Sequence, residues 1–167
     1  MNTYVEVVDY MKEHGCVPDG FNQWDLREEI LHRYDRGLTV AHTALVLNCL
    51  PEDFDQWGIV DKNGWTVAHT AADLRKLPEN FNQWDLRTMH GDTVIGRCIF
   101  VGKIPCKPFR QWWIQEKRKS VFEISLRKRG IYETKKWMAE EDWNLVVTDD
   151  GETCQEVYER LKNENLR

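Results

Sequence analysis

The stretch Gly64-Trp65-Thr66-Val67-Ala68-His69-Thr70-Ala71-Ala72 decides the fold, because a turn residue leads directly into an apolar helical face. A threonine ahead of an apolar run is a typical helix N-cap, since its hydroxyl accepts a hydrogen bond from a first-turn amide. The same pattern returns at 37–42, with weaker copies at 91–94 and 151–153. The sequence therefore predicts a series of similar helix starts.

The spacing of these helix starts is regular. The hydroxyl residues Thr39, Thr66, Thr93 and Ser120 are each 27 positions apart. A second motif, Phe-x-Gln-Trp, recurs at 21–24, 54–57, 81–84 and 109–112, and an eroded copy ends at Trp143. A fixed period of this length is typical of repeat architectures.

Each repeat is predicted to contain two helices. In the copies that start at Thr39, Thr66 and Thr93, offsets 1, 2, 5, 6, 8 and 11 from the hydroxyl are apolar, which predicts one buried helical face. A proline follows the hydroxyl by twelve residues at 51, 78 and 105, and Pro is favoured in a first helical turn. We therefore expect a second, shorter helix that starts at the proline and carries the Phe and Trp on one face.

These repeats predict an all-α helical solenoid of about five short repeats with N- and C-terminal capping helices. One repeat cannot bury its apolar faces alone, whereas stacked neighbours can. We expect one domain, 1–167, with an N-terminal cap at 1–17, repeats at 18–50, 51–77, 78–104 and 105–131, and a last repeat with the C-terminal cap at 132–167. The capping helices are expected at 4–14 and 153–166.

The stretch 64–72 resembles the ankyrin repeat, whose helix start reads Gly-x-Thr-Pro-Leu-His-x-Ala-Ala. It departs in having Val67 for Pro and a period of 27 residues instead of about 33. The resemblance implies an interaction module without catalytic residues. It also implies that His42 and His69 are structural and bond the threonine side chain and the turn backbone between neighbouring repeats.

The predicted structural residues of the repeat are therefore Thr39, His42, Thr66, His69, Trp24, Trp57, Trp84 and Trp112. The tryptophans stand at equivalent positions, which favours packing over recognition. Metal or catalytic chemistry is the alternative for the two histidines.

Composition narrows the classes of function. The chain has 167 residues, a net charge of −5 and five cysteines without a CxxC pair, which favours a reducing cytoplasm. We expect no signal peptide and no membrane span. No phosphate loop, metalloprotease motif or nucleophile elbow occurs, so we predict a non-enzyme that needs no cofactor and no metal.

Charge is unevenly distributed along the chain. Segment 97–136 has twelve Lys or Arg against three acids, and the remainder has eleven against twenty-five. This segment includes the repeat that lacks the glycine and the histidine, and broken local rules often mark function. The predicted partner-binding residues are Arg110, Trp113, Lys117, Arg118, Lys119, Arg127, Lys128 and Arg129.

Three interpretations of this basic segment remain open. An acidic partner protein, or a second copy of the chain in a homodimer, fits by charge complementarity. Basic residues beside aromatics also bind nucleic acid, although the net charge opposes it. A solvated charged face is the third interpretation.

A second candidate partner-binding site is the long first turn, 27–36, with Arg27, Glu28, Glu29, Arg33 and Tyr34. It alternatively folds back and buries Ile30 and Leu31. Acidic stretches at 19–29 and 52–61 also allow a nucleic-acid mimic. The predicted function is stoichiometric inhibition or masking of a macromolecular partner, either as an immunity protein for a toxin or as a bacterial or phage protein that disables a defence complex.

Overall fold

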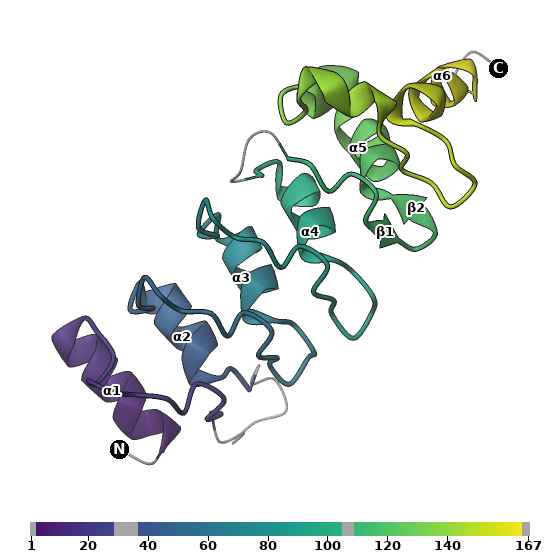
Figure 1. The fold of residues 1–167 in the computed structure, drawn as a ribbon. Coiled ribbons are helices and arrows are strands. Elements are labelled where there is room, and N and C mark those ends of the chain that lie inside the picture. The colour runs from purple at the N-terminus through teal and green to yellow at the C-terminus, as the bar shows by residue number, and fades with distance from the viewer. Residues whose placement is uncertain (1–2, 29–36, 105–108, 165–167) are drawn as a thin grey trace. The chain divides into compact units, whose positions relative to one another are not determined.

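The computed structural model describes residues 3–28, 37–104 and 109–164, and most of its regular structure is helical (Figure 1). The helices are α1 (Tyr4–His14), α2 (Val40–Leu47), α3 (Val67–Asp73), α4 (Val94–Val101), α5 (Val121–Lys135), the 3-10 helix η1 (Glu140–Asn144) and α6 (Cys154–Glu164). The predicted helical class is confirmed. The all-α prediction is incomplete, because β1 (Gln115–Glu116) and β2 (Lys119–Ser120) form an antiparallel hairpin.

The chain divides into two compact units. The first comprises Met1–Leu77 and Leu86–His90, and the second comprises Pro78–Asp85 and Gly91–Arg167. Within the first unit α2 packs against both α1 and α3, and within the second α5 packs against α4 and α6 (Figure 1). Helices of seven or eight residues are unstable in isolation, so packing between neighbours stabilises α2, α3 and α4.

The predicted hydroxyl residues cap four of the helices. Thr39 Oγ1 accepts from the His42 amide of α2, and Thr66 Oγ1 accepts from the His69 amide of α3. Thr93 caps α4 in the same way through the Gly96 amide, and Ser120 caps α5 through the Glu123 amide. The 27-residue register of the sequence is thus a register of helix starts in the structure.

The prediction of a second helix at each proline is wrong for the described copies. In the copy at 51–59, single turns close through Phe54 N to Pro51 O at 3.1 Å and Ile59 N to Gln56 O at 3.3 Å. The carbonyls that a helix would use internally accept instead from the start of α3, since Val67 N donates to Ile59 O and Ala68 N to Trp57 O. These bonds satisfy first-turn amides of α3, which lack partners within the helix.

The Phe-x-Gln-Trp motif builds a chain of edge-to-face aromatic contacts within each unit. In the first unit it runs through Phe21, Trp24, Phe54 and Trp57, with ring centroids 5.1 Å apart at each step. In the second unit it runs through Phe81, Trp84, Phe109, Trp112, Phe122, Trp143 and Tyr158. Such pairs contribute about 0.5–1.5 kcal/mol each beyond the burial of their area.

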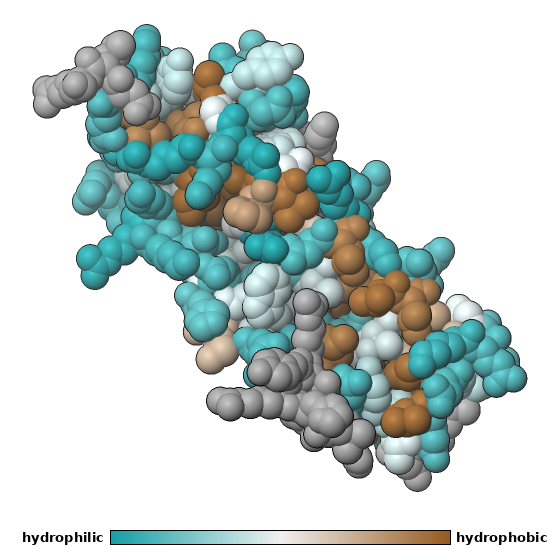
Figure 2. Space-filling model, turned by 180° about the vertical axis from the view of Figure 1, so that it is seen from behind, coloured by the Kyte–Doolittle hydropathy of each residue, from teal (hydrophilic) through white to brown (hydrophobic). Residues whose placement is uncertain are grey.

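Much of the remaining surface is hydrophilic, with hydrophobic patches on the face shown in Figure 2. The most exposed large hydrophobic side chains of the described residues are Val5, Met89, Phe100, Trp113, Tyr132 and Val146. Single exposed apolar residues are ordinary, so only those at unusual positions in the repeat bear on function.

Candidate partner-binding surface

The repeated Thr and His at the starts of α2 and α3 make structural hydrogen bonds. His42 Nδ1 lies 2.8 Å from Thr39 Oγ1, and His42 Nε2 donates to the carbonyl of Trp65 at 3.2 Å. In α3, His69 Nδ1 lies 2.7 Å from Thr66 Oγ1. Both imidazoles are fully buried, and burial lowers the pKa of His42.

The start of α4 departs from this arrangement. Gly96 stands where α2 and α3 have histidine, and Glu116 of β1 fills the space, since a Cβ on Gly96 would lie 2.0 Å from Glu116 Oε2. Glu116 Oε2 accepts from Thr93 N at 2.8 Å and from Thr93 Oγ1 at 2.6 Å. The carboxylate also lies at the positive end of the α4 dipole, so it anchors the hairpin to this helix.

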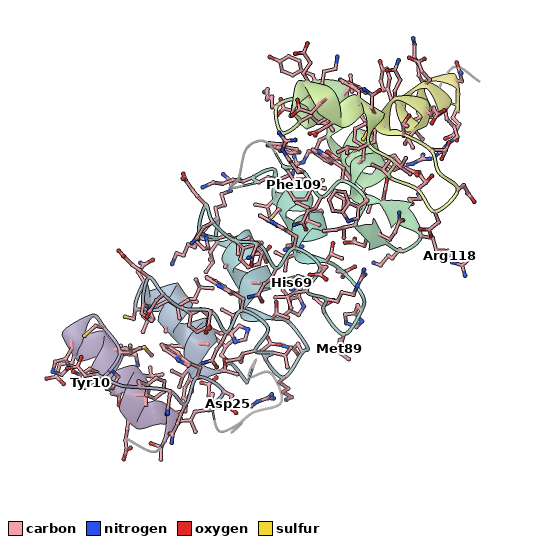
Figure 3. The ribbon with its side chains drawn as sticks, in the orientation of Figure 1. Tyr10, Asp25, His69, Met89, Phe109 and Arg118 are labelled. Carbon is pink, nitrogen blue, oxygen red and sulfur yellow. The ribbon has the colours of Figure 1, made fainter. Side chains whose placement is uncertain are left out.

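The hairpin closes through a two-residue turn at Lys117 and Arg118. Both residues have left-handed backbones, with φ of 51° and 67°, which is the requirement of a type I′ hairpin turn. Lys117 Nζ forms an ion pair with Asp92 Oδ1 at 2.6 Å. Arg118 lies at the tip of the hairpin, and its side chain points away from the body of the second unit (Figure 3).

An exposed tryptophan precedes the hairpin. Trp112 is fully buried, whereas its neighbour Trp113 is 51% exposed. The three earlier repeats have Asp25, Gly58 and Asp85 after their tryptophan, so an apolar side chain is out of pattern here. We define the hairpin surface as Trp113, Lys117, Arg118 and Lys119.

The other predicted partner-binding residues lie on other elements, and several have structural contacts. Arg129 donates to the carbonyls of Ile99 and Phe100 at the end of α4. Arg127 pairs with Glu123 at 2.9 Å and with Glu164 at 3.1 Å. Arg110 pairs with Glu141 at 2.7 Å, and Lys128 is exposed on α5. The structure therefore brings together 117–119 but not all eight residues.

The second predicted site is described only in part. Arg27 pairs with Thr39 in a β-bridge and donates to the carbonyl of Val60 at 3.3 Å. The Glu28 amide donates to the carbonyl of Leu38 at 3.0 Å. Glu29, Arg33 and Tyr34 lie outside the described residues, as do Ile30 and Leu31.

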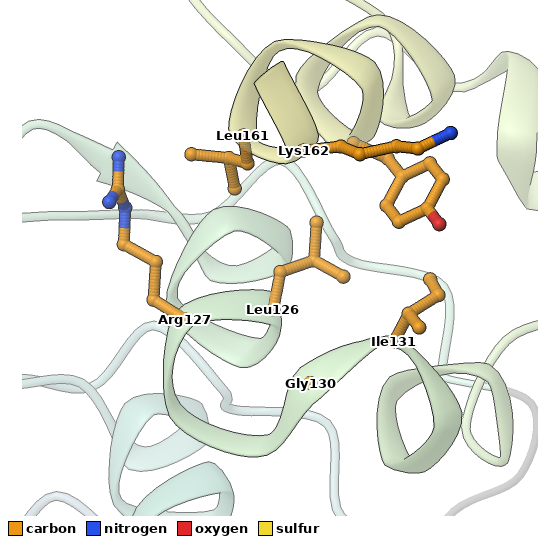
Figure 4. A pocket seen from close by; sticks show the side chains of 7 residues that line it. Leu126, Arg127, Gly130, Ile131, Leu161 and Lys162 are labelled. Atoms are coloured by element: carbon orange, nitrogen blue, oxygen red, sulfur yellow. The ribbon is translucent and has the colours of Figure 1, made fainter. Parts of the chain in front are cut away.

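A groove of about 550 Å³ lies between α5 and α6. Leu126, Ile131 and Leu161 point into it (Figure 4). Its two cations are already paired, Arg127 as above and Lys162 with Glu159 at 3.8 Å. The groove is therefore an apolar one whose charges are neutralised within the chain.

The described residues hold little that resembles a reactive centre. No group of three or more His, Cys, Asp or Glu side chains among them is arranged to hold a metal ion. Burial and the nearby Asp142 raise the pKa of Cys154 to about 12, so this thiol is protonated at neutral pH. None of the helices in this part of the chain is long and apolar enough to cross a bilayer.

Sequence reasoning missed the two acids that hold the hairpin, Glu116 and Asp92. A signal was present, because the repeat register aligns Glu116 with Lys62 and Met89 and aligns Gly96 with the two histidines. Both departures fall where α4 meets the hairpin.

No protein-family model matches the chain, and no curated protein is significantly similar to it.

Proposed function

We propose that the chain is a solenoid of ankyrin-like repeats that binds one other protein stoichiometrically, with an acidic surface of that partner docking on the hairpin surface. The observation that carries the proposal is the concentration of out-of-pattern side chains there. Trp113 replaces Asp or Gly of the other repeats, and Lys117-Arg118 replaces a glycine-containing turn such as Asn63-Gly64.

The chemistry of the hairpin surface supports recognition of an acidic protein. Arg118 and Lys119 are exposed and have no acidic partner among the residues that the structure describes. Tryptophan and arginine are enriched in binding hot spots, and a complementary charge pattern accelerates association and fixes the orientation of the partner. A surface with one exposed aromatic side chain and two exposed cations has both properties.

The scaffold supports binding rather than chemistry. In the helix starts the repeated Thr and His side chains bond to one another, and the repeated tryptophans are buried. A rigid module that carries recognition residues on a turn is suited to cover a functional surface of its partner. We therefore propose masking as the mode of action, as in immunity proteins or in bacterial or phage inhibitors of defence complexes.

Nucleic acid is the competing partner for a basic hairpin. The whole chain has a net charge of −5, which repels a polyanion at long range. A protein partner needs only local complementarity, so the observations favour it.

The experiment is affinity purification of the tagged chain from its native host, with and without nuclease, followed by identification of the retained protein. The recovered protein is then purified alone and mixed with the chain, and the mass of the complex is measured by light scattering. We expect one partner, retained after nuclease treatment, in a complex of fixed stoichiometry. Loss of the association with nuclease, or a salt dependence as steep as that of phosphate binding, would contradict the proposal.

A matched pair of variants tests the location of the site. Arg118→Glu with Lys119→Glu reverses two charges on the hairpin surface, and Lys12→Glu with Lys62→Glu reverses two exposed charges in the first unit. We expect only the first pair to release the partner. Equal loss with both pairs indicates a general charge effect and contradicts docking at the hairpin surface.

A further inference from the structure

We infer that the Lys117-Arg118 turn is a preorganised recognition turn in which the Arg118 guanidinium binds a carboxylate of an acidic protein segment. The inference rests on the proposed function and names its contact residue. Arginine then stands at this position because it serves binding, since the backbone there favours glycine.

The repeat register supplies the first argument. Gly37, Gly64 and Gly91 precede the capping hydroxyl by two residues and have φ of 56°, 70° and 79°. Arg118 precedes Ser120 by two residues and has φ of 67°. With Gly151, which has φ of 86° two residues before Thr153, five equivalent turns share one left-handed backbone, and only the turn at Arg118 has a side chain in this sterically disfavoured region.

The surroundings of Arg118 supply the second argument. Asn48 and Arg75 also have positive φ, of 61° and 59°, but they lie at the C-terminal ends of α2 and α3, where a left-handed residue ends the helix. Arg118 caps no helix, is exposed, and has no hydrogen bond or ion pair with any other residue that the structure describes. The hairpin imposes this backbone, and among the described residues no side-chain contact of Arg118 offsets it.

The anchoring of the hairpin supplies the third argument. Glu116 holds β1 to Thr93, and Lys117 pairs with Asp92, so the β1 side of the tip is attached to the segment that starts α4. Binding by a turn held in this way loses little conformational entropy, which favours affinity. The Asp92 partner neutralises Lys117, whereas Arg118 and Lys119 have no ion pair with the residues at 3–28, 37–104 and 109–164.

The geometry of the guanidinium indicates the class of ligand. Its planar set of donors binds both oxygens of a carboxylate, which an ammonium group cannot match. The exposed Trp113 adds an apolar surface in the same repeat. An acidic peptide segment with an apolar residue beside its carboxylates fits both features.

The test is a titration of the full chain, labelled with 15N, followed by backbone amide shifts in low salt. The probe is a twelve-residue peptide of Glu and Asp with one central Leu, and the control peptide has Gln and Asn in place of the acids. We expect saturable shifts at 117–120 with the acidic peptide only. Shifts distributed equally over the exposed lysines of both units, or larger shifts at 117–120 with an oligo-dT probe, would overturn the inference.

Three variants separate binding from folding. We expect Arg118→Gly to weaken peptide binding by about tenfold or more and to leave the Tm unchanged or a few degrees higher. Arg118→Lys keeps the charge and the backbone strain and should lose most of the affinity as well. Lys12→Gln, on α1, removes one positive charge elsewhere and should leave binding unchanged.

Two results for Arg118→Gly contradict the inference. A Tm lower by several degrees means that the fold requires Arg118, and unchanged binding means that the partner does not. If the partner found in the host binds Arg118→Gly as tightly as the native chain, the recognition turn is wrong while the proposed function stands. If no partner protein is retained at all, the proposed function fails first.

Discussion

At the residue scale, the buried Thr39 and His42 pair shows how the repeat pattern determines a protonation state. The carbonyl of Trp65 only accepts, so His42 Nε2 has the proton and donates to it. His42 Nδ1 is then unprotonated and accepts from the Thr39 hydroxyl. The histidine is neutral in the folded chain, in keeping with its lowered pKa.

This arrangement predicts a dependence of stability on pH. Because the folded pKa of His42 lies below 6.5, the unfolded chain binds the proton more readily. The contribution of His42 is therefore complete above about pH 6.5 and decreases as the pH falls through the folded pKa. Urea unfolding between pH 8 and pH 5 should show a smaller fall in stability for His42→Gln than for the native chain.

His90→Gln, at an exposed position, is the control and should keep the native pH profile. At pH 8 we expect His42→Gln to lose about 1–3 kcal/mol of stability, because it leaves buried polar groups unpaired. An identical pH profile for His42→Gln and the native chain would contradict a neutral buried imidazole.

Two glycines of the first unit separate backbone strain from crowding. Gly64 and Gly20 both have a φ of 70°, but a Cβ on Gly64 would lie 2.7 Å from Met89 Cβ, whereas a Cβ on Gly20 meets nothing within 4 Å. We expect Gly20→Ala to cost about 1–2 kcal/mol from the backbone alone. Gly64→Ala should cost about 1–3 kcal/mol more, measured by urea unfolding. Equal losses would contradict the close approach.

At the element scale, the helix starts were predictable from the sequence and the proline segments were not. A capping hydroxyl and an apolar face are local signals, and the capped helices begin directly after Thr39, Thr66, Thr93 and Ser120. The turn at 51–59 depends on amides of α3 that need acceptors, which is a tertiary requirement. Periodicity cannot reveal from which amide a carbonyl accepts a hydrogen bond.

The contact between Gly96 of α4 and Glu116 of the hairpin predicts that the effect of Gly96→Ala on stability changes sign when the Glu116 side chain is removed. In the native chain Gly96→Ala displaces the Glu116 carboxylate from Thr93 and should destabilise by about 1–3 kcal/mol. With Glu116→Ala the space is empty, and Gly96→Ala should stabilise by up to about 1 kcal/mol through helix propensity. Additive effects, measured by thermal and urea unfolding, would show that the two residues do not share this space.

Substitutions of the neighbouring Trp112 and Trp113 should have opposite effects, one on stability and the other on partner binding. Trp112 is fully buried, and its indole Nε1 donates to Asp142 Oδ2 at 3.2 Å, so Trp112→Ala should cost about 3–5 kcal/mol. Trp113→Ala should change stability by no more than about 0.5 kcal/mol. The same Trp113 variant should bind the partner more weakly. A stability loss at Trp113 as large as that at Trp112 would place it in the core instead.

At the scale of the whole molecule, sequence alone predicted the helical class and the uneven charge, and it located the segment that contains the hairpin surface. It did not distinguish Arg127 and Arg129 from Arg118, which has no partner in the described part of the chain, because the ion pair with Glu164 and the bonds to the end of α4 join residues far apart in the chain. It also did not predict the hairpin, since Lys117-Arg118 lacks the glycine that marks such a turn.

The most direct test of the central claim is the Kd of the purified partner for the matched charge-reversal pairs, measured by isothermal titration calorimetry. We predict that Arg118→Glu with Lys119→Glu raises the Kd by about a hundredfold or more, while Lys12→Glu with Lys62→Glu changes it by less than about threefold. A Kd that rises equally for both pairs, or that the hairpin pair leaves unchanged, would contradict partner binding at the hairpin surface.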